Sequence, residues 1–209
     1  MQLTANDFVR LFQAWTEIIN NNKDYLIKLD AIAGDGDLGL ALTDGFNAVM
    51  ASLEKAETDD IGMLFFQAGK TMSVYAPSSL GTLIAFGLMD AGKSMKGNKV
   101  ISGCDLSVLL EEFESAIMKR GKAKPGEKTF LDGFDPAVCV LKAATSEDEI
   151  PAALRSAAME AHHGAMSTVG MLAKYGRIAV RGEDSRQILD PGAVVASLMI
   201  TALAETFAH

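Results

Sequence analysis

Residues 30–46 read DAIAGDGDLGLALTDGF, and this stretch decides between two fold classes for the chain. Its first ten positions interleave acidic and small residues, namely Asp30, Asp35 and Asp37 with Gly34, Gly36 and Gly39. The glycines spell G-x-G-x-x-G, which in dinucleotide-binding proteins joins a strand of a parallel sheet to a helix. The aspartates instead indicate a loop that binds cations, because carboxylate oxygens are the ligands that Mg²⁺ and Ca²⁺ prefer.

The dinucleotide interpretation needs a strand before the glycines, a helix after them and an acidic residue about 20 positions later. Residues 25–29 (YLIKL) can form a short strand, and Glu54 or Glu57 lies at an acceptable distance. The rest of the chain, however, offers no run of strands for a parallel sheet. Asp35 and Asp37 would also face the pyrophosphate, although two unit charges about 4 Å apart repel by roughly 4 kcal/mol at an effective dielectric near 20. We therefore reject this interpretation.

A second phosphate motif is present at residues 87–94, where GLMDAGKS matches G-x-x-x-x-G-K-[ST]. In a phosphate-binding loop of this type the Lys and Ser open a helix whose amides hold the phosphates. Here residues 95–103 (MKGNKVISG) follow, with two glycines and no helical period. Lys93 and Ser94 are better placed in the last turn of a helix, where a cation interacts favourably with the helix dipole.

The aspartates themselves suit Mg²⁺ better than Ca²⁺. An EF-hand that starts at Asp35 would place Gly39 at its fifth position, Leu40 at its glycine position and Phe46 at its closing acid, which excludes this motif. Mg²⁺ commonly takes a few carboxylates and completes its shell with water and substrate phosphates. The alternative from the residues alone is a solvated loop in which the aspartates only cap and turn the backbone.

Hydrophobic periodicity predicts about eight helices in one all-α domain over residues 1–209. The expected helices cover residues 5–19, 43–55, 61–75, 79–95, 106–120, 135–146, 151–176 and 193–207. We expect Thr4, Asp105 and either Ser78 or Ser79 to cap helix starts, and Asp59-Asp60 to start the helix over residues 61–75. We expect Gly121 to end a helix in the left-handed conformation. No stretch alternates at period two, and the short connections favour antiparallel neighbours, as in a bundle.

Composition limits the function classes. The 209 residues carry a net charge of −8, which argues against nucleic acid as a partner, since that affinity depends on Lys and Arg. No apolar run reaches the roughly 18 residues that span a membrane, and the N-terminus lacks the pattern of a signal peptide. Cys104 and Cys139 are isolated and are expected to be reduced thiols in a cytoplasmic protein.

Several dispersed motifs, in the right order over the whole chain, resemble the L subunit of the dihydroxyacetone kinases, the DhaL or DAK2 domain family. They are D-x-x-x-G-D-x-D-x-G at residues 30–39, Ser78-Ser79-Leu80-Gly81-Thr82, Arg120-Gly121-Lys122, Pro125-Gly126-Glu127-Lys128-Thr129, Lys174-Tyr175-Gly176-Arg177 and Asp190-Pro191-Gly192-Ala193. The resemblance implies a single-domain barrel of eight antiparallel helices, in agreement with the helix count above.

The resemblance also implies a nucleotide site. Asp30, Asp35 and Asp37 are expected to coordinate two Mg²⁺ ions that hold the phosphates of a bound ADP or ATP. The contacts expected with the nucleotide come from Leu38, Gly39, Leu40, Ala41, Ser78, Ser79, Gly121, Phe130, Arg177, Asp190, Pro191 and Gly192.

In stand-alone L subunits, ADP receives phosphate from a phosphohistidine on a phosphotransferase-system protein and passes it to dihydroxyacetone, which a separate K subunit binds. The resemblance therefore implies a phosphotransferase subunit that works in a complex or as a homodimer, with a K subunit as partner and no membrane. Such chemistry asks mainly for positioning and charge neutralisation, so it needs no nucleophilic side chain. His162, His163 and His209 lack the neighbours of a catalytic histidine and are expected to be non-catalytic.

The sequence departs from the family pattern near the phosphates. The family usually has His where this chain has Leu38, and an Asn common two positions after the glycine is Ala41. The usual S-G-P-L loop is replaced by residues 76–79 (APSS). These changes leave the metal ligands intact but leave open both the phosphate donor and the substrate, which can be dihydroxyacetone or another ketose or polyol. They also leave open a regulatory or adaptor subunit that holds nucleotide without turnover.

Overall fold

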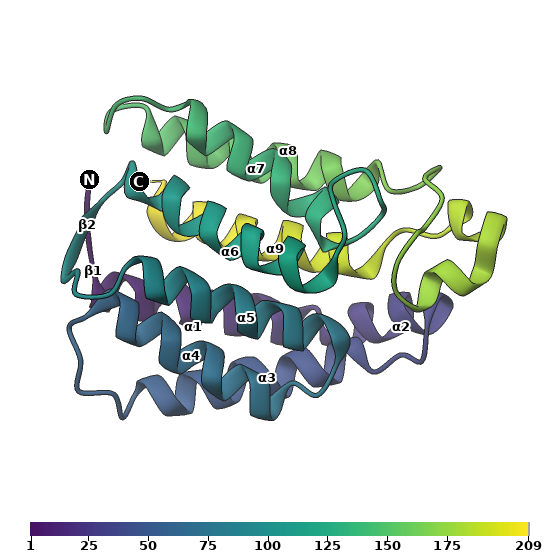
Figure 1. Ribbon diagram of the computed structural model, residues 1–209, viewed down its shortest axis with the longest axis horizontal. Helices are drawn as coiled ribbons and strands as arrows, with labels where there is room; N and C mark the ends of the chain where they lie inside the picture. Colours follow the sequence, from purple (N-terminus) through teal and green to yellow (C-terminus); the bar gives the residue numbers. More distant parts are fainter. Residues whose placement is uncertain (209) are drawn as a thin grey trace.

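The helices predicted from periodicity are present and close into a barrel (Figure 1). The structure is a computed structural model that describes residues 1–208. Within that range it contains nine α-helices, one 3₁₀ segment and two short strands. The α-helices are α1 (Ala5–Asn21), α2 (Lys23–Ala33), α3 (Leu38–Leu53), α4 (Ile61–Tyr75), α5 (Ser79–Ser94), α6 (Asp105–Gly121), α7 (Phe130–Ala143), α8 (Ile150–Met166) and α9 (Pro191–Phe207). The 3₁₀ segment η1 is Arg177–Gln187, and the strands β1 (Gln2–Thr4) and β2 (Val100–Ser102) pair antiparallel.

Eight of the helices form the ring. Each helix from α3 to α8 packs against the next helix in sequence. Helix α1 packs against both α9 and α3, which closes the ring. The core between them is aromatic and aliphatic, with edge-on ring contacts of Phe8 with Phe65 and of Phe12 with Trp15. The Trp15 indole also donates a hydrogen bond to the backbone carbonyl of Met199 in α9 (2.8 Å). The expected all-α, single-domain fold is therefore confirmed.

Helix α9 is buried around most of its circumference, as expected for a helix that is apolar on all sides. Among the described residues no single helix has the length and apolar character to cross a membrane. The 3₁₀ segment and α9 reach that threshold only when taken together, and they are bent by 86°.

The predicted caps at Thr4 and Ser78 are confirmed, and Asp60 caps the helix that was expected to start at Asp59-Asp60. The side chain of Asp60 accepts a hydrogen bond from the Met63 amide (3.0 Å), and Ser78 accepts one from the Gly81 amide (3.0 Å). At Thr4, the backbone amide and the hydroxyl both donate to the Asp7 carboxylate, each at 2.7 Å. These local bonds satisfy amides that have no partner within their own helix.

Other predicted boundaries are wrong. Gly121 is still helical, and Lys122 takes the left-handed conformation instead (φ 58°). Asp105 lies inside the first turn of α6, where its carboxylate accepts hydrogen bonds from the backbone amide and hydroxyl of Ser102, both at 2.8 Å. The stretch YLIKL belongs to helix α2, so the strand required by the dinucleotide interpretation is absent from that segment.

The helix expected over residues 151–176 ends ten residues early, at Met166. The chain then turns at Gly170 (φ 96°), a conformation that favours glycine. The paired strands β1 and β2 were not predicted, because three residues each are too few to show a period of two. His209, expected to be non-catalytic, lies outside the described residues.

Glycines let the last three helices approach closely. A Cβ on Gly164 of α8 would overlap the backbone carbonyl of Asp132 in α7, and a Cβ on Gly133 of α7 would overlap the carbonyl of Ala193 in α9. These contacts place the N-terminal turns of α7 and α9 side by side. That arrangement matters because both turns border the functional site.

One buried carboxylate makes stability depend on pH. Glu114 of α6 is 5% exposed, and its Oε1 has no hydrogen-bond partner within residues 1–208. Burial, followed by the charges of Asp135 and Glu111, raises the pKa of Glu114 from 4.5 to about 7, and Lys142 opposes the shift only in part. Since the folded form holds this proton more tightly, stability falls as pH rises from about 4.5 to about 7 and stays at the lower value above it.

We predict that Glu114→Gln raises the free energy of unfolding at about pH 8 by roughly 2–3 kcal/mol, because the variant carries no buried charge. The gain should vanish at about pH 3, where wild-type Glu114 is protonated in both states. Urea unfolding at both pH values measures this difference. The matched control is Glu112→Gln, on the exposed face of the same helix. An equal effect of both variants at both pH values would contradict the prediction.

Candidate functional site

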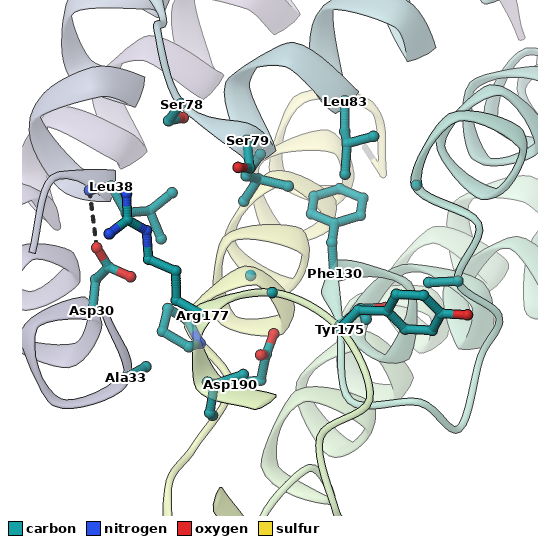
Figure 2. Close-up of a pocket in the computed structure, with 18 of the residues that line it drawn as sticks. Asp30, Ala33, Leu38, Ser78, Ser79, Leu83, Phe130, Tyr175, Arg177 and Asp190 are labelled. Carbon is teal, nitrogen blue, oxygen red and sulfur yellow. Dashed lines mark hydrogen bonds between the residues drawn. The ribbon is translucent and has the colours of Figure 1, made fainter. Parts of the chain in front are cut away.

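A cavity of about 800 Å³ opens at one end of the barrel (Figure 2). Five parts of the chain line it. They are the turn between α2 and α3, the loop before α5 with the start of that helix, the end of α6 with the loop that leads into α7, residues 175–178 at the start of η1, and residues 190–192 at the start of α9. Its volume lies in the range of pockets that hold drug-sized ligands and cofactors. One half of the wall is acidic and polar, and the other half is mainly apolar.

The acidic half is formed at the turn from α2 to α3. Asp30 lies in the last turn of α2, and Asp35 and Asp37 follow on the connecting turn. Each of the three can offer a carboxylate oxygen, and these oxygens lie within 4.8 Å of one another. The turn is tight because Gly36 takes a left-handed φ of 76°. This oxygen-only donor set is of the kind that hard divalent cations prefer.

Hydrogen bonds fix the shape of this turn. The Gly34 amide donates to the backbone carbonyl of Asp30 (2.5 Å), which ends α2. The Leu38 amide, in the first turn of α3, donates to Oδ2 of Asp30 (3.2 Å; dashed in Figure 2). Asp30 thus ties the end of one helix to the start of the next, and its second oxygen is left for a ligand.

The cluster is electrostatically strained. Partial burial, together with the charges of Asp35 and Asp30, raises the pKa of Asp37 above its usual value, and Arg177 opposes this shift. The Arg177 guanidinium forms an ion pair with Oδ2 of Asp35 at 2.8 Å. Figure 2 shows this side chain extending from the η1 side of the cavity toward Asp30 and Leu38. One arginine thus offsets part of three negative charges, so a cation is favoured here.

The other polar part of the wall comes from the start of α5. Ser78 uses its hydroxyl to cap this helix, whereas the neighbouring Ser79 is exposed. Both residues line the cavity, together with Thr82. The apolar end is built by Leu83 and Phe130, which face each other in Figure 2.

Asp190 borders the apolar end and is 5% exposed. Its Oδ2 accepts a hydrogen bond from the Ala193 amide (2.8 Å), which caps α9. Burial raises the pKa of Asp190 to about 7, although the hydrogen bond with Ala193 and the charge of Lys128 oppose the shift. Asp190 therefore shapes the wall as a helix cap.

Most residues expected at a nucleotide lie together in this one cavity. They are Asp30, Asp35, Asp37, Leu38, Ser78, Ser79, Gly121, Phe130, Arg177, Asp190, Pro191 and Gly192. Three others do not line it. Gly39 packs its Cα against Lys23 and Ile27 of α2, Leu40 is 48% exposed outside the lining, and Ala41 is buried. His162 and His163 are exposed on α8 and also lie outside the lining.

The sequence interpretation missed several residues of the wall. Arg120 lines the cavity, and its guanidinium lies 3.9 Å from the centre of the Phe86 ring. Tyr175 and Lys128 also line it. The available signal for all three was their position inside the motifs at residues 120–122, 125–129 and 174–177.

Comparison with known proteins gives a family model, described as the DAK2 domain, that matches residues 32–205. The chain is 29% identical over 205 residues to the ADP-binding subunit DhaL of the PEP-dependent dihydroxyacetone kinase of Escherichia coli K12, with 98% of each chain covered. It is 31% identical over 201 residues to the corresponding subunit of dihydroxyacetone kinase 2 of Listeria innocua, which covers 95% of this chain and 93% of that relative.

Among solved structures, the dihydroxyacetone kinase of C. freundii in its native form has a TM-score of 0.75 at 24% identity, covering 95% of this chain and 34% of that chain. The same kinase in complex with AMP-PNP and Mg²⁺ has a TM-score of 0.64 at 21% identity, covering 94% and 33%. This chain thus spans about a third of that kinase and shares its fold over that part.

The repulsion within the acidic cluster generates a prediction. In metal-free buffer, we expect Asp37→Asn to raise the melting temperature by about 1–3 °C, because removing one of three like charges relieves up to roughly 1 kcal/mol of repulsion at an exposed site. Differential scanning calorimetry with a chelator present measures the shift. Asp44→Asn, an exposed aspartate of the same helix, is the control and should change little. A lower melting temperature for the Asp37 variant would mean that the cluster is not strained.

Proposed function

Because the chain belongs to the DAK2 domain family, we propose that it is a phosphotransferase subunit that holds ADP or ATP with two Mg²⁺ ions in this cavity. It would pass phosphate to dihydroxyacetone, or to a related ketose or polyol, bound on a separate K subunit. One observation carries the proposal: three carboxylates and Arg177 gather at one end of a cavity whose other end is apolar. Such a cavity suits a nucleoside with a charged tail.

The residues present fit Mg²⁺ at the acidic end. Asp30, Asp35 and Asp37 would hold the metal through oxygen atoms, and the metal would neutralise the phosphate charge that the carboxylates alone repel. The Arg177 guanidinium, whose side chain is 68% exposed beside Asp35, has donors free to bind phosphate oxygens. Helix α3 also begins at this end of the cavity, and a helix N-terminus favours anions.

The apolar end would hold the nucleoside. Leu83 and Phe130 supply an apolar wall, and the caps at Ser78 and Thr129 fix α5 and α7, the two helices that carry these side chains. With the phosphates at the aspartates, the chain's own contribution is positioning and charge balance, which is what phosphoryl transfer chiefly requires. No side chain of the cavity needs to act as a nucleophile.

The partners follow from the relatives. The E. coli and Listeria relatives are named as ADP-binding subunits of PEP-dependent kinases. By analogy, we propose that this chain works in the cytoplasm in a complex with a K subunit, as a homodimer or hetero-complex. A phosphohistidine protein of the phosphotransferase system would reload its ADP.

We predict that the purified chain retains adenine nucleotide, and that Asp35→Asn or Asp37→Asn abolishes retention in millimolar Mg²⁺. Each variant removes a proposed metal ligand, and without the metal the diphosphate meets the remaining carboxylates unscreened. Mass spectrometry of the nucleotide and metal analysis of the same samples measure the loss. Asp44→Asn is the matched control and should retain both. A wild-type chain that binds no nucleotide with Mg²⁺ present would refute the proposed function.

The alternative function is an adaptor that holds nucleotide without transferring phosphate, and the replacements at Leu38 and Ala41 favour it. A turnover measurement separates the two functions. If the chain is a phosphotransferase subunit, the ADP-loaded chain should convert dihydroxyacetone or erythrulose to its phosphate when it is mixed with a K subunit and a phosphohistidine donor protein. Product formation is followed by coupled spectrophotometry, with the Asp37→Asn chain as blank. Stable ADP binding with no phosphate exchange from either ATP or the donor protein would instead indicate the adaptor.

A further inference from the structure

A lysine is completely buried beside the cavity. Lys128, in the loop between α6 and α7, has 0% of its surface exposed. Its ammonium donates hydrogen bonds to the backbone carbonyls of Thr168 (2.5 Å) and Ile188 (2.6 Å). Lysine is rarely buried in full without a partner, because desolvation of the ammonium is costly. The two carbonyls and the nearby charge of Asp190 are what stabilise it here.

The backbone around Lys128 is held in an unusual conformation. Lys128 has a left-handed φ of 62°, a region that side-chain-bearing residues seldom adopt. The carboxylate of Asp132 fixes the loop on both sides of it, accepting hydrogen bonds from the amides of Gly126 and Thr129, both at 2.6 Å. Such conformations persist where the surroundings determine them, and they concentrate at functional sites. Here the conformation directs the lysine side chain inward.

The two carbonyls that Lys128 binds are the two ends of one excursion of the chain, which we call the 168–188 segment. This segment leaves α8, runs through η1 and returns just before α9. Inside it, the Gly170 amide donates to the carbonyl of Arg186 (2.7 Å), and the Ala173 amide donates to the Ser185 hydroxyl (3.1 Å). Lys128 therefore closes the base of a loop that is already paired along its length.

The middle of the 168–188 segment faces the cavity. Ala173 and Ile178 pack against Ala33 of α2 in a small hydrophobic cluster separate from the main core. Tyr175 and Arg177, which lie between them in sequence, line the cavity, and Arg177 pairs with Asp35. In Figure 1 the segment lies at the same end of the barrel as α2.

We propose that Lys128 is a positioning residue of the nucleotide site: by clamping both ends of the 168–188 segment, it holds Tyr175 and Arg177 against the cavity. The inference rests on the proposed function, since it assigns these two residues to the bound nucleotide. Lys128 acts through the segment. The acidic cluster is carried by α2 and α3, so the metal ligands do not depend on the clamp.

The test compares Lys128→Met with Lys124→Met, an exposed lysine of the same loop, by three measurements. Hydrogen exchange reports on the segment, calorimetric titration gives ADP affinity with Mg²⁺, and electron paramagnetic resonance gives Mn²⁺ affinity without nucleotide. For Lys128→Met we expect lost protection confined to residues 168–188, ADP binding weaker by at least about tenfold, and Mn²⁺ binding within about twofold of wild type. Lys124→Met should match wild type in all three.

Two results overturn the proposal: a folded Lys128→Met chain with unchanged ADP affinity, or protection lost evenly over the whole barrel. If Lys128→Met does not fold, Lys128→Gln, which keeps one donor group, takes its place. It should lose protection only in the segment and bind ADP about threefold more weakly. Its failure to do so also overturns the proposal. A wild-type chain that binds no ADP refutes the proposed function instead, and hydrogen exchange then decides alone whether Lys128 clamps the segment.

Discussion

Three carboxylates held within 4.8 Å of one another at a single turn are the constraint around which this end of the barrel is organised. Like charges so close are unfavourable unless something opposes them. The chain supplies an amide of α3 to Asp30 and the guanidinium of Arg177 to Asp35. Neither removes the excess of negative charge. The remaining demand for positive charge is what makes a divalent cation, and through it a phosphate, a fitting ligand.

Arg177 connects this constraint to the loop between α6 and α7. It belongs to the 168–188 segment, whose ends are bound by the buried ammonium of Lys128. Ionic and hydrogen-bond contacts of two cations therefore tie one segment to the rest of the site, Arg177 at its middle and Lys128 at its base. The close packing of α7 against α8 and α9, which Gly164 and Gly133 permit, keeps the wall behind them rigid. The cavity is thus defined by charge at one end and by packing at the other.

Local features of the sequence were sufficient for much of this structure. Helix periods are set by residues three and four apart, and the caps at Asp60 and Ser78 by residues three apart. The acidic cluster was accessible for the same reason, since its three members lie within eight positions. The charges of the aspartates, not the spacing of the glycines, identified the kind of site.

What could not be predicted depends on contacts distant in sequence. The helix expected to reach residue 176 ends at Met166, and one reason is that the Thr168 carbonyl is bound by Lys128, 40 residues earlier. Gly39, whose phosphate contact stays a prediction, is required as glycine by the close approach of α2. The left-handed residue after α6 is Lys122 although Gly121 precedes it, and nothing local distinguishes the two positions.

The most direct measurement is anomalous diffraction from crystals grown with Mn²⁺ and ADP. If the acidic turn is a metal–phosphate site, two manganese peaks should appear between Asp30, Asp35 and Asp37 and the diphosphate, with the base near Phe130. An ordered ADP elsewhere on the protein, or manganese absent from these three carboxylates, would contradict the assignment.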